Sequence, residues 1–300
     1  MGGDVIKFAK GLITPESLTI TGSLTPKQSK GFYSAIVNNN EFLKKVTTKQ
    51  MNSLELFVDA YDVAEGILVR VPEGSEPTNS QKRTYSNIGC TLRALKAQLF
   101  ADVTRSTIEN NADNPNFEKE LFNGFSIRFG NELVKLGFEG VDETGDSFEN
   151  LNKGWIQVAK DSSDVKKDTY ASTDKMVDRL SGLIENLDKD AKGPSTSILM
   201  SWSDWEKYML ELADTTKTAA LFTDAKTKSF MGYPIEVNKY MPNGVYMATP
   251  LKNLVFGMLT KIYRERTWNA RKRAIEYTFD VGNDYEIIIK KWVSLMTLTT

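Results

Sequence analysis

The sequence predicts an α+β fold in which one long amphipathic helix separates an extended β-hairpin from a mixed domain of strands and helices. Three observations lead to this prediction. Apolar residues recur at helical spacing over residues 115–136, and they alternate at period two in runs within residues 51–103. They alternate again in short runs near the C-terminus. Because both periods occur in one chain of 300 residues, we expect a sheet with helices on its faces.

Composition limits the classes of function. The chain has 40% hydrophobic and 26% charged residues and a formal net charge of -1, which is ordinary for a globular protein. No overall field would attract nucleic acid or an anionic membrane. No apolar run approaches the roughly 18 residues of a membrane helix. The first residues lack the apolar core of a secretory signal and the myristoylation pattern, so we expect neither.

The absence of histidine and the scarcity of cysteine argue against most catalytic and metal sites. No histidine is present, which removes His-based triads and His-ligated metals. The one cysteine, Cys90, is better explained as a small buried apolar residue than as a catalytic thiolate. Phosphate-loop and dinucleotide motifs are missing, and the acidic run at 142–146 lacks the spacing of a calcium loop. We expect no catalytic residue, no metal and no cofactor.

Residues 1–50 are expected to form an extended arm and a short helix. Thr25 and Pro26 begin the helix, whose apolar residues include Phe32 and Ile36, and residues 38–40 break it. The preceding arm is polar without a clear period, but it carries these apolar residues: Phe8, Leu12, Ile13, Leu18 and Ile20. Such an arm has enough apolar side chains to lie on a partner surface. The alternative is a frayed terminus.

Residues 51–103 are expected to form a long β-hairpin. Alternating runs flank the polar segment 72–84, which contains two prolines, two serines and a glycine, as is typical of a turn. An isolated hairpin is barely stable in water, so this one needs a partner surface on its own chain or on a neighbour. The candidate inter-subunit residues at its tip are Arg70, Glu73, Glu76, Lys82 and Arg83. The alternative is that these are solvated loop charges.

The long helix is expected over residues 115–136. Asn114 is a suitable N-cap, and Pro115 fits the first helical position. Gly137 and Gly140 are expected to end the helix, and a Gly-, Asp- and Asn-rich turn follows up to residue 155. The apolar face of the helix, which predicts its packing surface, consists of Leu121, Phe125, Phe129, Leu133 and Leu136.

The second half of the chain is expected to be a mixed domain. Its expected elements, in order, are a polar linker at 158–172, a helix capped by Ser172, a buried strand at 197–200, a helix opened by a capping box of Ser203 and Glu206, strands at 233–239, 244–249 and 252–258, and alternating strands up to the C-terminus.

Basic residues with interleaved aromatics make the run 261–273 the best candidate for weak contact with DNA or a neighbour: Arg264, Arg266, Arg271, Lys272 and Arg273. A charged strand pair facing a neighbour's carboxylates or water is the explanation that we favour.

Several runs resemble one family. FEGVDETGDSFENLNKGWIQ, at 138–157, resembles the segment after the long "spine" helix in the major capsid proteins of tailed bacteriophages, which have the Hong Kong-97-type fold. The ending LNKGWIQ is most similar to those of temperate contractile-tailed phages. SILMSWSDWEKY, MGYPIEV and VYMATPLKNLVFG then follow in the family's order. The parts that the resemblance implies are an N-terminal arm and short helix (1–50), an extended loop (51–103), the spine helix and peripheral domain (104–160), an axial domain (161–258) and strands returning into the peripheral domain (259–300).

The resemblance also implies a function. The chain would be a structural protein, not an enzyme, that assembles as hexamers and pentamers into an icosahedral phage head around double-stranded DNA. Its partners would be its own copies, a portal, DNA through non-specific contact and, because the first 25 residues form no long coiled coil, a separate scaffolding protein. It would be assembled in the host cytoplasm, reside in the virion and have no membrane partner. The alternatives are an encapsulin-type shell that encloses cargo, or a cytoplasmic α+β enzyme or binding protein with an Asp, Glu or Lys site.

Overall fold

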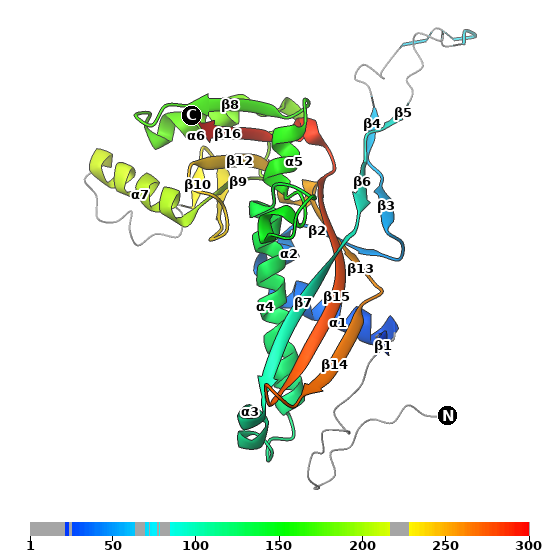
Figure 1. Ribbon diagram of the computed structural model, residues 1–300. Helices are drawn as coiled ribbons and strands as arrows, with labels where there is room; N and C mark the ends of the chain where they lie inside the picture. The colour runs from blue at the N-terminus through cyan, green and yellow to red at the C-terminus, as the bar shows by residue number, and fades with distance from the viewer. Residues whose placement is uncertain are drawn as a thin grey trace. The chain divides into compact units, whose positions relative to one another are not determined.

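The computed structural model describes residues 22–23, 26–63, 70–71, 73–76, 78, 85–216 and 228–299 (Figure 1). The chain forms two compact units. The first takes its residues from 1–54, 94–134 and 257–284, and the second takes them from 55–93, 135–256 and 285–300. Each unit contains a six-stranded sheet and helices, which confirms the α+β class. No helix among the described residues is long and apolar enough to span a bilayer.

The first unit is a sheet whose strands run in the order β1-β14-β15-β13-β2, with β7 also paired to β15. The strands are β1 Gly22–Ser23, β2 Thr47–Met51, β7 Leu95–Thr104, β13 Leu254–Leu259, β14 Tyr263–Asn269 and β15 Ala274–Ile287. The helices are α1 Pro26–Asn39, α2 Glu41–Lys45, α3 Arg105–Asn110 and α4 Phe117–Glu139. The chain passes from the first unit into the second within α4 and β15, and from the second into the first within β13.

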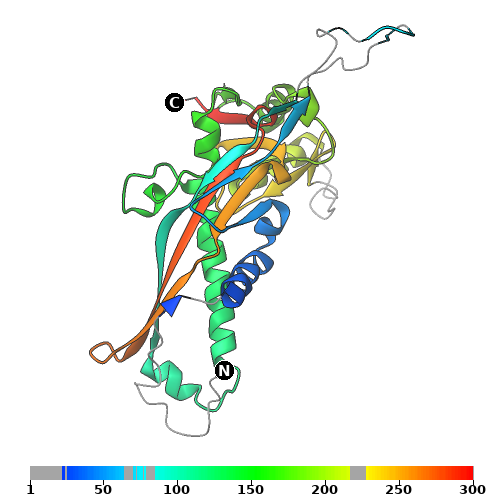
Figure 2. The same cartoon turned by 90° about the vertical axis from the view of Figure 1, so that its right-hand side faces the viewer.

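Aromatic side chains fill the core of the first unit. Phe32 of α1 stacks on Phe279 of β15, with ring centroids 5.3 Å apart. From α4, Phe129 meets the Phe279 ring edge-on at 5.5 Å, and Phe125 meets Tyr277 at 5.6 Å. Helices α1 and α4 therefore lie on the same face of the long strands (Figure 2). This packing explains why apolar residues recur at helical spacing along α4.

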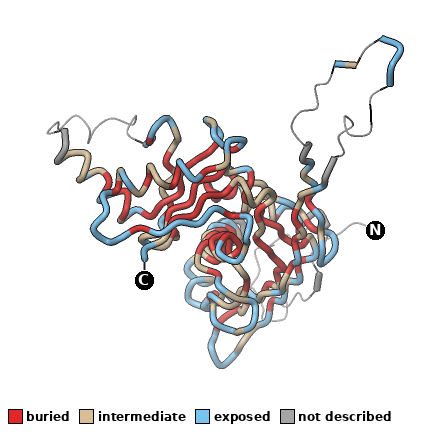
Figure 3. The backbone as a smooth tube through the Cα atoms, turned by 90° about the horizontal axis from the view of Figure 1, so that it is seen from above, coloured by how far each residue is buried: buried red, intermediate tan, exposed pale blue. Residues whose placement is uncertain are grey.

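The second unit is a sheet in the order β10-β11-β9-β12-β16-β8. Its strands are β8 Lys166–Tyr170, β9 Thr196–Met200, β10 Ser229–Phe230, β11 Tyr233–Val237, β12 Val245–Pro250 and β16 Ser294–Leu298. Its helices are α5 Trp155–Asp161, α6 Met176–Glu185 and α7 Trp202–Thr216. All five residues of β9 are buried, and Leu180 and Leu183 of α6 belong to the same core. The buried parts of the backbone are red in Figure 3.

A two-stranded hairpin also belongs to the second unit. Strand β3 Glu55–Val58 pairs with β6 Cys90–Arg93, and β4 Tyr61–Val63 pairs with β5 Tyr85–Asn87, both antiparallel. The expected hairpin over residues 51–103 is therefore too long. Strand β7 instead pairs with β15 in the first sheet, with Val103 opposite Ile275. Alternation identifies a strand but not its partner, and this partner lies far along the chain.

Four further expectations are corrected. The expected linker at 158–172 holds the end of α5 and the edge strand β8, four of whose five residues are exposed, so the burial contrast that marks a strand is weak. Ser172 does not cap a helix, because α6 begins at Met176. The capping pair at α7 is Ser201 and Asp204 rather than Ser203 and Glu206, because the Asp204 N–H donates to Ser201 Oγ at 3.1 Å. Strand β16 joins the second sheet and does not return to the first.

Candidate functional site

The hairpin is the first candidate surface for contact with another subunit. The β3–β6 and β4–β5 pairings have the same register, because Val58 pairs with Cys90 and Tyr61 pairs with Asn87. Between them, Asn87 Oδ1 accepts the Ala60 and Gly89 N–H groups, and Asn87 Nδ2 donates to Asp59 at 2.7 Å. Large apolar side chains at its base and along it are exposed: Leu54, Phe57 and Tyr61. A free hairpin with these side chains in water would be weakly stable, which points to a covering surface.

Gly89 is required where the two ladders meet. A Cβ at this position would overlap the carbonyl oxygen of Val58, which is backbone of the paired strand and cannot rotate away. We expect Gly89→Ala to separate the strands near Val58 and to make residues 55–93 more sensitive to limited proteolysis. The control is Gly31→Ala in α1, where a Cβ meets nothing within 4 Å. Equal cleavage rates for the two variants would contradict this role of Gly89.

The hairpin tip is only partly described. Arg70, Glu73 and Glu76 are exposed, as expected for residues that contact another subunit or water. Lys82 and Arg83 lie outside the described residues. Gly74 has φ 81°, a left-handed conformation that favours glycine, so a tight turn occurs at this point of the segment. The inter-subunit role of the five tip residues stays a prediction.

The long helix is present as α4. Asn114 Oδ1 accepts the Asn116 N–H at 2.9 Å, but the helix begins at Phe117, so Asn114 is not its N-cap and Pro115 is not its first helical residue, which corrects both expectations. Of the five residues on its predicted apolar face, Leu121 and Phe125 are half-buried, and the other three are buried: Phe129, Leu133 and Leu136. The helix continues past Gly137, which corrects one expected stop, and it ends before Gly140.

Position 137 of the helix requires glycine, because aromatic rings pack directly on the backbone there. A Cβ there would come within 2.5 Å of Trp155 Cζ3 and 2.9 Å of Tyr285 Cε1. Trp155 is fully buried, and its Nε1 donates to the Val255 carbonyl at 2.9 Å. Gly140 and Gly154 bring the two backbones together just beyond, with the Gly154 N–H donating to Gly140 O at 2.9 Å. Gly137 and Gly140, which were expected to end the helix, thus form with Gly154 and Trp155 a close-packed junction between the helix and the following loop, called the elbow below.

The structure does not bring the five basic residues of 261–273 to one surface. Arg266 is 7% exposed, with its guanidinium 5.5 Å from the centre of the Tyr277 ring. Arg264 is half-buried on the same face of β14. Lys272 Nζ lies 2.8 Å from Glu276 and 3.6 Å from Asp102. The hydrogen bond between Lys272 and Glu276 raises the pKa of the lysine and lowers the pKa of the carboxyl group.

The cations that remain on the surface are at the turn between β14 and β15. Arg271 and Arg273 are exposed there. Arg273 has φ 50°, and its carbonyl accepts the Arg105 N–H at 2.8 Å, so the turn is held against the start of α3. Of the five predicted basic residues, Arg266 is therefore unsuited to contact with a phosphate backbone or a neighbouring carboxylate, because it faces the aromatic core.

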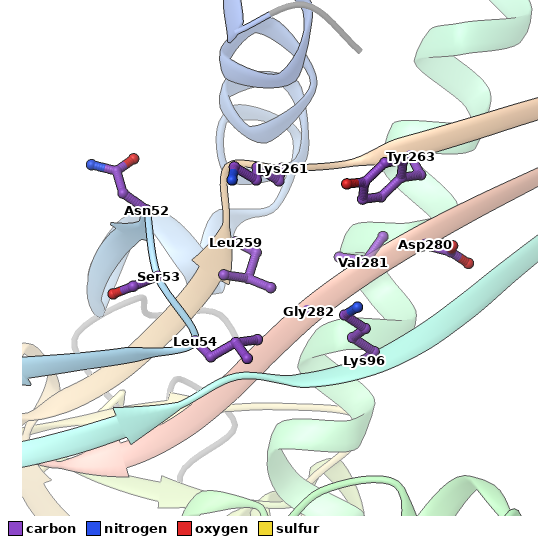
Figure 4. Close-up of a pocket in the computed structure, with 10 residues that line it drawn as sticks. All are labelled: Asn52, Ser53, Leu54, Lys96, Leu259, Lys261, Tyr263, Asp280, Val281 and Gly282. Carbon is purple, nitrogen blue, oxygen red and sulfur yellow. The ribbon is translucent and has the colours of Figure 1, made fainter. Parts of the chain in front are cut away.

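A shallow hollow of about 220 Å³ on the first unit was not foreseen (Figure 4). Its floor includes Leu259 and Gly282, where a Cβ would overlap the Leu259 side chain. Its rim carries Lys96, Lys261 and Tyr263. Four separate segments of the chain build it, so no local motif could have revealed it. It holds no catalytic constellation, and no cluster of metal-ligating side chains occurs among the described residues.

Solved structures of shell particles are similar to this chain. A chain of the procapsid of satellite phage P4 aligns with 91% of this chain and 100% of its own length, with a TM-score of 0.70 and 12% identity. A capsid chain of an empty GTA particle covers 97% of this chain and 96% of its own, with a TM-score of 0.57 and 14% identity. A chain of the holo-SrpI encapsulin complex from Synechococcus elongatus covers 85% of both, with a TM-score of 0.54 and 12% identity.

No protein-family model matches the chain, and no curated protein matches it. At 12–14% identity the structural likeness establishes the fold. It extends over 91% of this chain for the P4 procapsid chain and over 97% for the GTA capsid chain. The chain therefore has the Hong Kong-97-type fold of phage capsid proteins, as the resemblance of its sequence implied.

Proposed function

We propose that this chain is the major capsid protein of a tailed phage, a structural shell subunit without catalytic activity. The observation that carries the proposal is a shell-protein fold over almost the entire chain, with an alignment to the P4 procapsid chain that leaves none of that chain uncovered. The hairpin supports it, because its exposed apolar residues need a surface. Each subunit would contact its neighbour through two different surfaces, and this heterologous contact would repeat around hexamers and pentamers.

The parts of the fold have separate roles in this proposal. The hairpin and the N-terminal arm brace neighbouring subunits, and the tip residues Arg70, Glu73 and Glu76 make exposed polar contacts there. Contact with packaged double-stranded DNA or with a neighbour is weak and sequence-independent, and it involves Arg271 and Arg273. A separate scaffolding protein and a portal complete the assembly. The site of assembly is the host cytoplasm, and the mature location is the virion.

Negative-stain electron microscopy tests this proposal. The protein is purified after expression alone and after expression with its neighbouring genes. We expect angular closed shells, or rings of six and five subunits, in at least one preparation. A monodisperse monomer or dimer in both preparations would overturn the proposal and favour an enzyme or binding protein of the α+β class.

An encapsulin-type compartment is the second candidate, because an encapsulin chain has the same fold. The two candidates differ in what the shell encloses. Particles purified from the native source are digested with nuclease and then opened. Protected double-stranded DNA with no stoichiometric second protein supports the phage capsid. A co-purified enzyme inside a shell without DNA supports the encapsulin.

A further inference from the structure

Strand β8 is the longer of the two edge strands of the second sheet. It pairs only with β16, and the strand at the other edge, β10, has two residues. Among the residues that the structure describes, no strand pairs with the outer side of β8 (Figure 1). Unpaired N–H and C=O groups along an edge accept a strand from another copy of a chain, which is a route to aggregation. The outer side of β8 is therefore a place where unwanted pairing between copies would start.

The register of β8 shows which backbone groups lie on its outer side. Strands β8 and β16 are parallel, with Lys166 opposite Ser294, and the Lys166 N–H donates to the Val293 carbonyl at 3.2 Å. In a parallel pair, residues that bond to the partner strand alternate with residues that point away from it. Lys167 and Thr169 therefore direct their N–H and C=O groups to the outer side.

One of these two outward N–H groups is already engaged by the neighbouring side chain. Asp168 Oδ1 accepts the Thr169 N–H at 2.8 Å. Asp168 Oδ2 accepts Nδ2 of Asn186, the C-cap residue of α6, at 3.0 Å, so two hydrogen bonds hold the carboxylate in place. A strand that approached this edge would have to displace a charge-assisted hydrogen bond to reach the Thr169 N–H.

Charged side chains occupy both faces of β8. The Lys167 side chain lies on the face opposite to Asp168, since successive side chains of a strand alternate. Its Nζ donates to the Lys160 carbonyl in the last turn of α5, where the helix dipole favours a cation. Lys166, Lys167 and Asp168 are all exposed, and charged residues on an edge strand disfavour the addition of a further strand.

We propose that Asp168 closes the outer edge of β8 to strand addition, so that the second sheets of two copies do not pair edge to edge. The carboxylate does this by occupying a backbone donor that an incoming strand would need. The proposal concerns the subunit itself and does not depend on the shell function. Contacts between copies then have to use other surfaces.

Two substitutions of Asp168 separate the hydrogen bond from the charge. Asp168→Ala removes the acceptor and one negative charge, whereas Asp168→Asn removes the same charge and keeps an oxygen that accepts the Thr169 N–H. A third variant combines Asp168→Ala with Thr169→Pro. Proline has no N–H, and the Thr169 N–H points away from β16, so this change removes the outward donor and leaves the pairing with β16 intact.

The full-length variants are compared with the unmodified protein as unassembled subunits. Analytical ultracentrifugation over a concentration series measures association, and hydrogen exchange of peptides that cover β8 locates it. We expect Asp168→Ala to form larger species at about tenfold lower concentration, because the hydrogen bond that a strand must displace is gone. Amide exchange in β8 should slow down in these species. Asp168→Asn and the combined variant should behave as the unmodified protein.

Three results would contradict the proposal. Asp168→Ala associates no more than the unmodified protein, or its association leaves amide exchange in β8 unchanged. Equal association of Asp168→Ala and Asp168→Asn would show that charge, and not the hydrogen bond, protects the edge. Association of the combined variant to the same extent as Asp168→Ala would show that the contact does not use the Thr169 N–H.

Discussion

Replacing Gly137 by alanine is expected to destabilise the subunit by about 3 kcal/mol, since forcing atoms into a well-packed core costs roughly 1–3 kcal/mol and occasionally more. The added Cβ would lie 2.5 Å from Trp155 and 2.9 Å from Tyr285. Neither ring has room to move. Trp155 is fully buried and hydrogen-bonded, and Tyr285, 1% exposed, meets it edge-on with ring centroids 5.1 Å apart.

The same helix contains a matched control. Gly124 lies in α4, is exposed, and has no atom within 4 Å of an added Cβ. Because alanine is favoured over glycine in a helix by about 1 kcal/mol, Gly124→Ala should stabilise the subunit slightly. Urea unfolding of the unassembled subunit measures both variants. The elbow assignment fails if the two substitutions shift the unfolding midpoint in the same direction by similar amounts.

The elbow also shows how far the sequence could predict this fold. The helix was predicted over residues 115–136 because the spacing of its apolar residues indicates a face that packs on the rest of the fold, and the structure has α4 at Phe117–Glu139. Gly137 was predicted as a stop because glycine often follows a helix, and no local pattern reports that the ring of Trp155 will pack there. Local signals therefore identified the element, whereas contacts between distant residues determined its end.

Strands were predictable to the extent that their two faces differ in burial. The central strand β9 is buried throughout and was predicted within one residue. The edge strand β8 was missed, because the residues Lys166 to Thr169 are all exposed and resemble a linker. Among the candidate sites, the exposed charges of the hairpin tip follow from composition. The burial of Arg266 does not, because it depends on pairing with Tyr277 on β15.

Deleting residues 73–83 is expected to leave a folded subunit and to weaken the shell. The described residues of this segment are exposed, so their removal takes no side chain from either core. The deletion would therefore lower only the free energy of association between neighbouring subunits, at the places where the tip contacts a neighbour. A loss of about 1.4 kcal/mol lowers an association constant about tenfold. Since a shell repeats each contact in every subunit, a modest loss per copy should lower particle yield and heat resistance clearly.

A charge-only variant separates the length of the hairpin from its ion pairs. Glu73→Gln with Glu76→Gln keeps the chain length, and exposed ion pairs contribute only about 0–1 kcal/mol each. We therefore expect this variant to form particles of nearly normal heat resistance, with any deficit largest at low salt because salt screens exposed charges. Particle yield and the melting temperature of assembled shells, together with the far-ultraviolet spectrum of the free subunit, are compared for both variants. If the deletion variant matches the unmodified protein in yield and heat resistance, the hairpin tip does not brace neighbouring subunits.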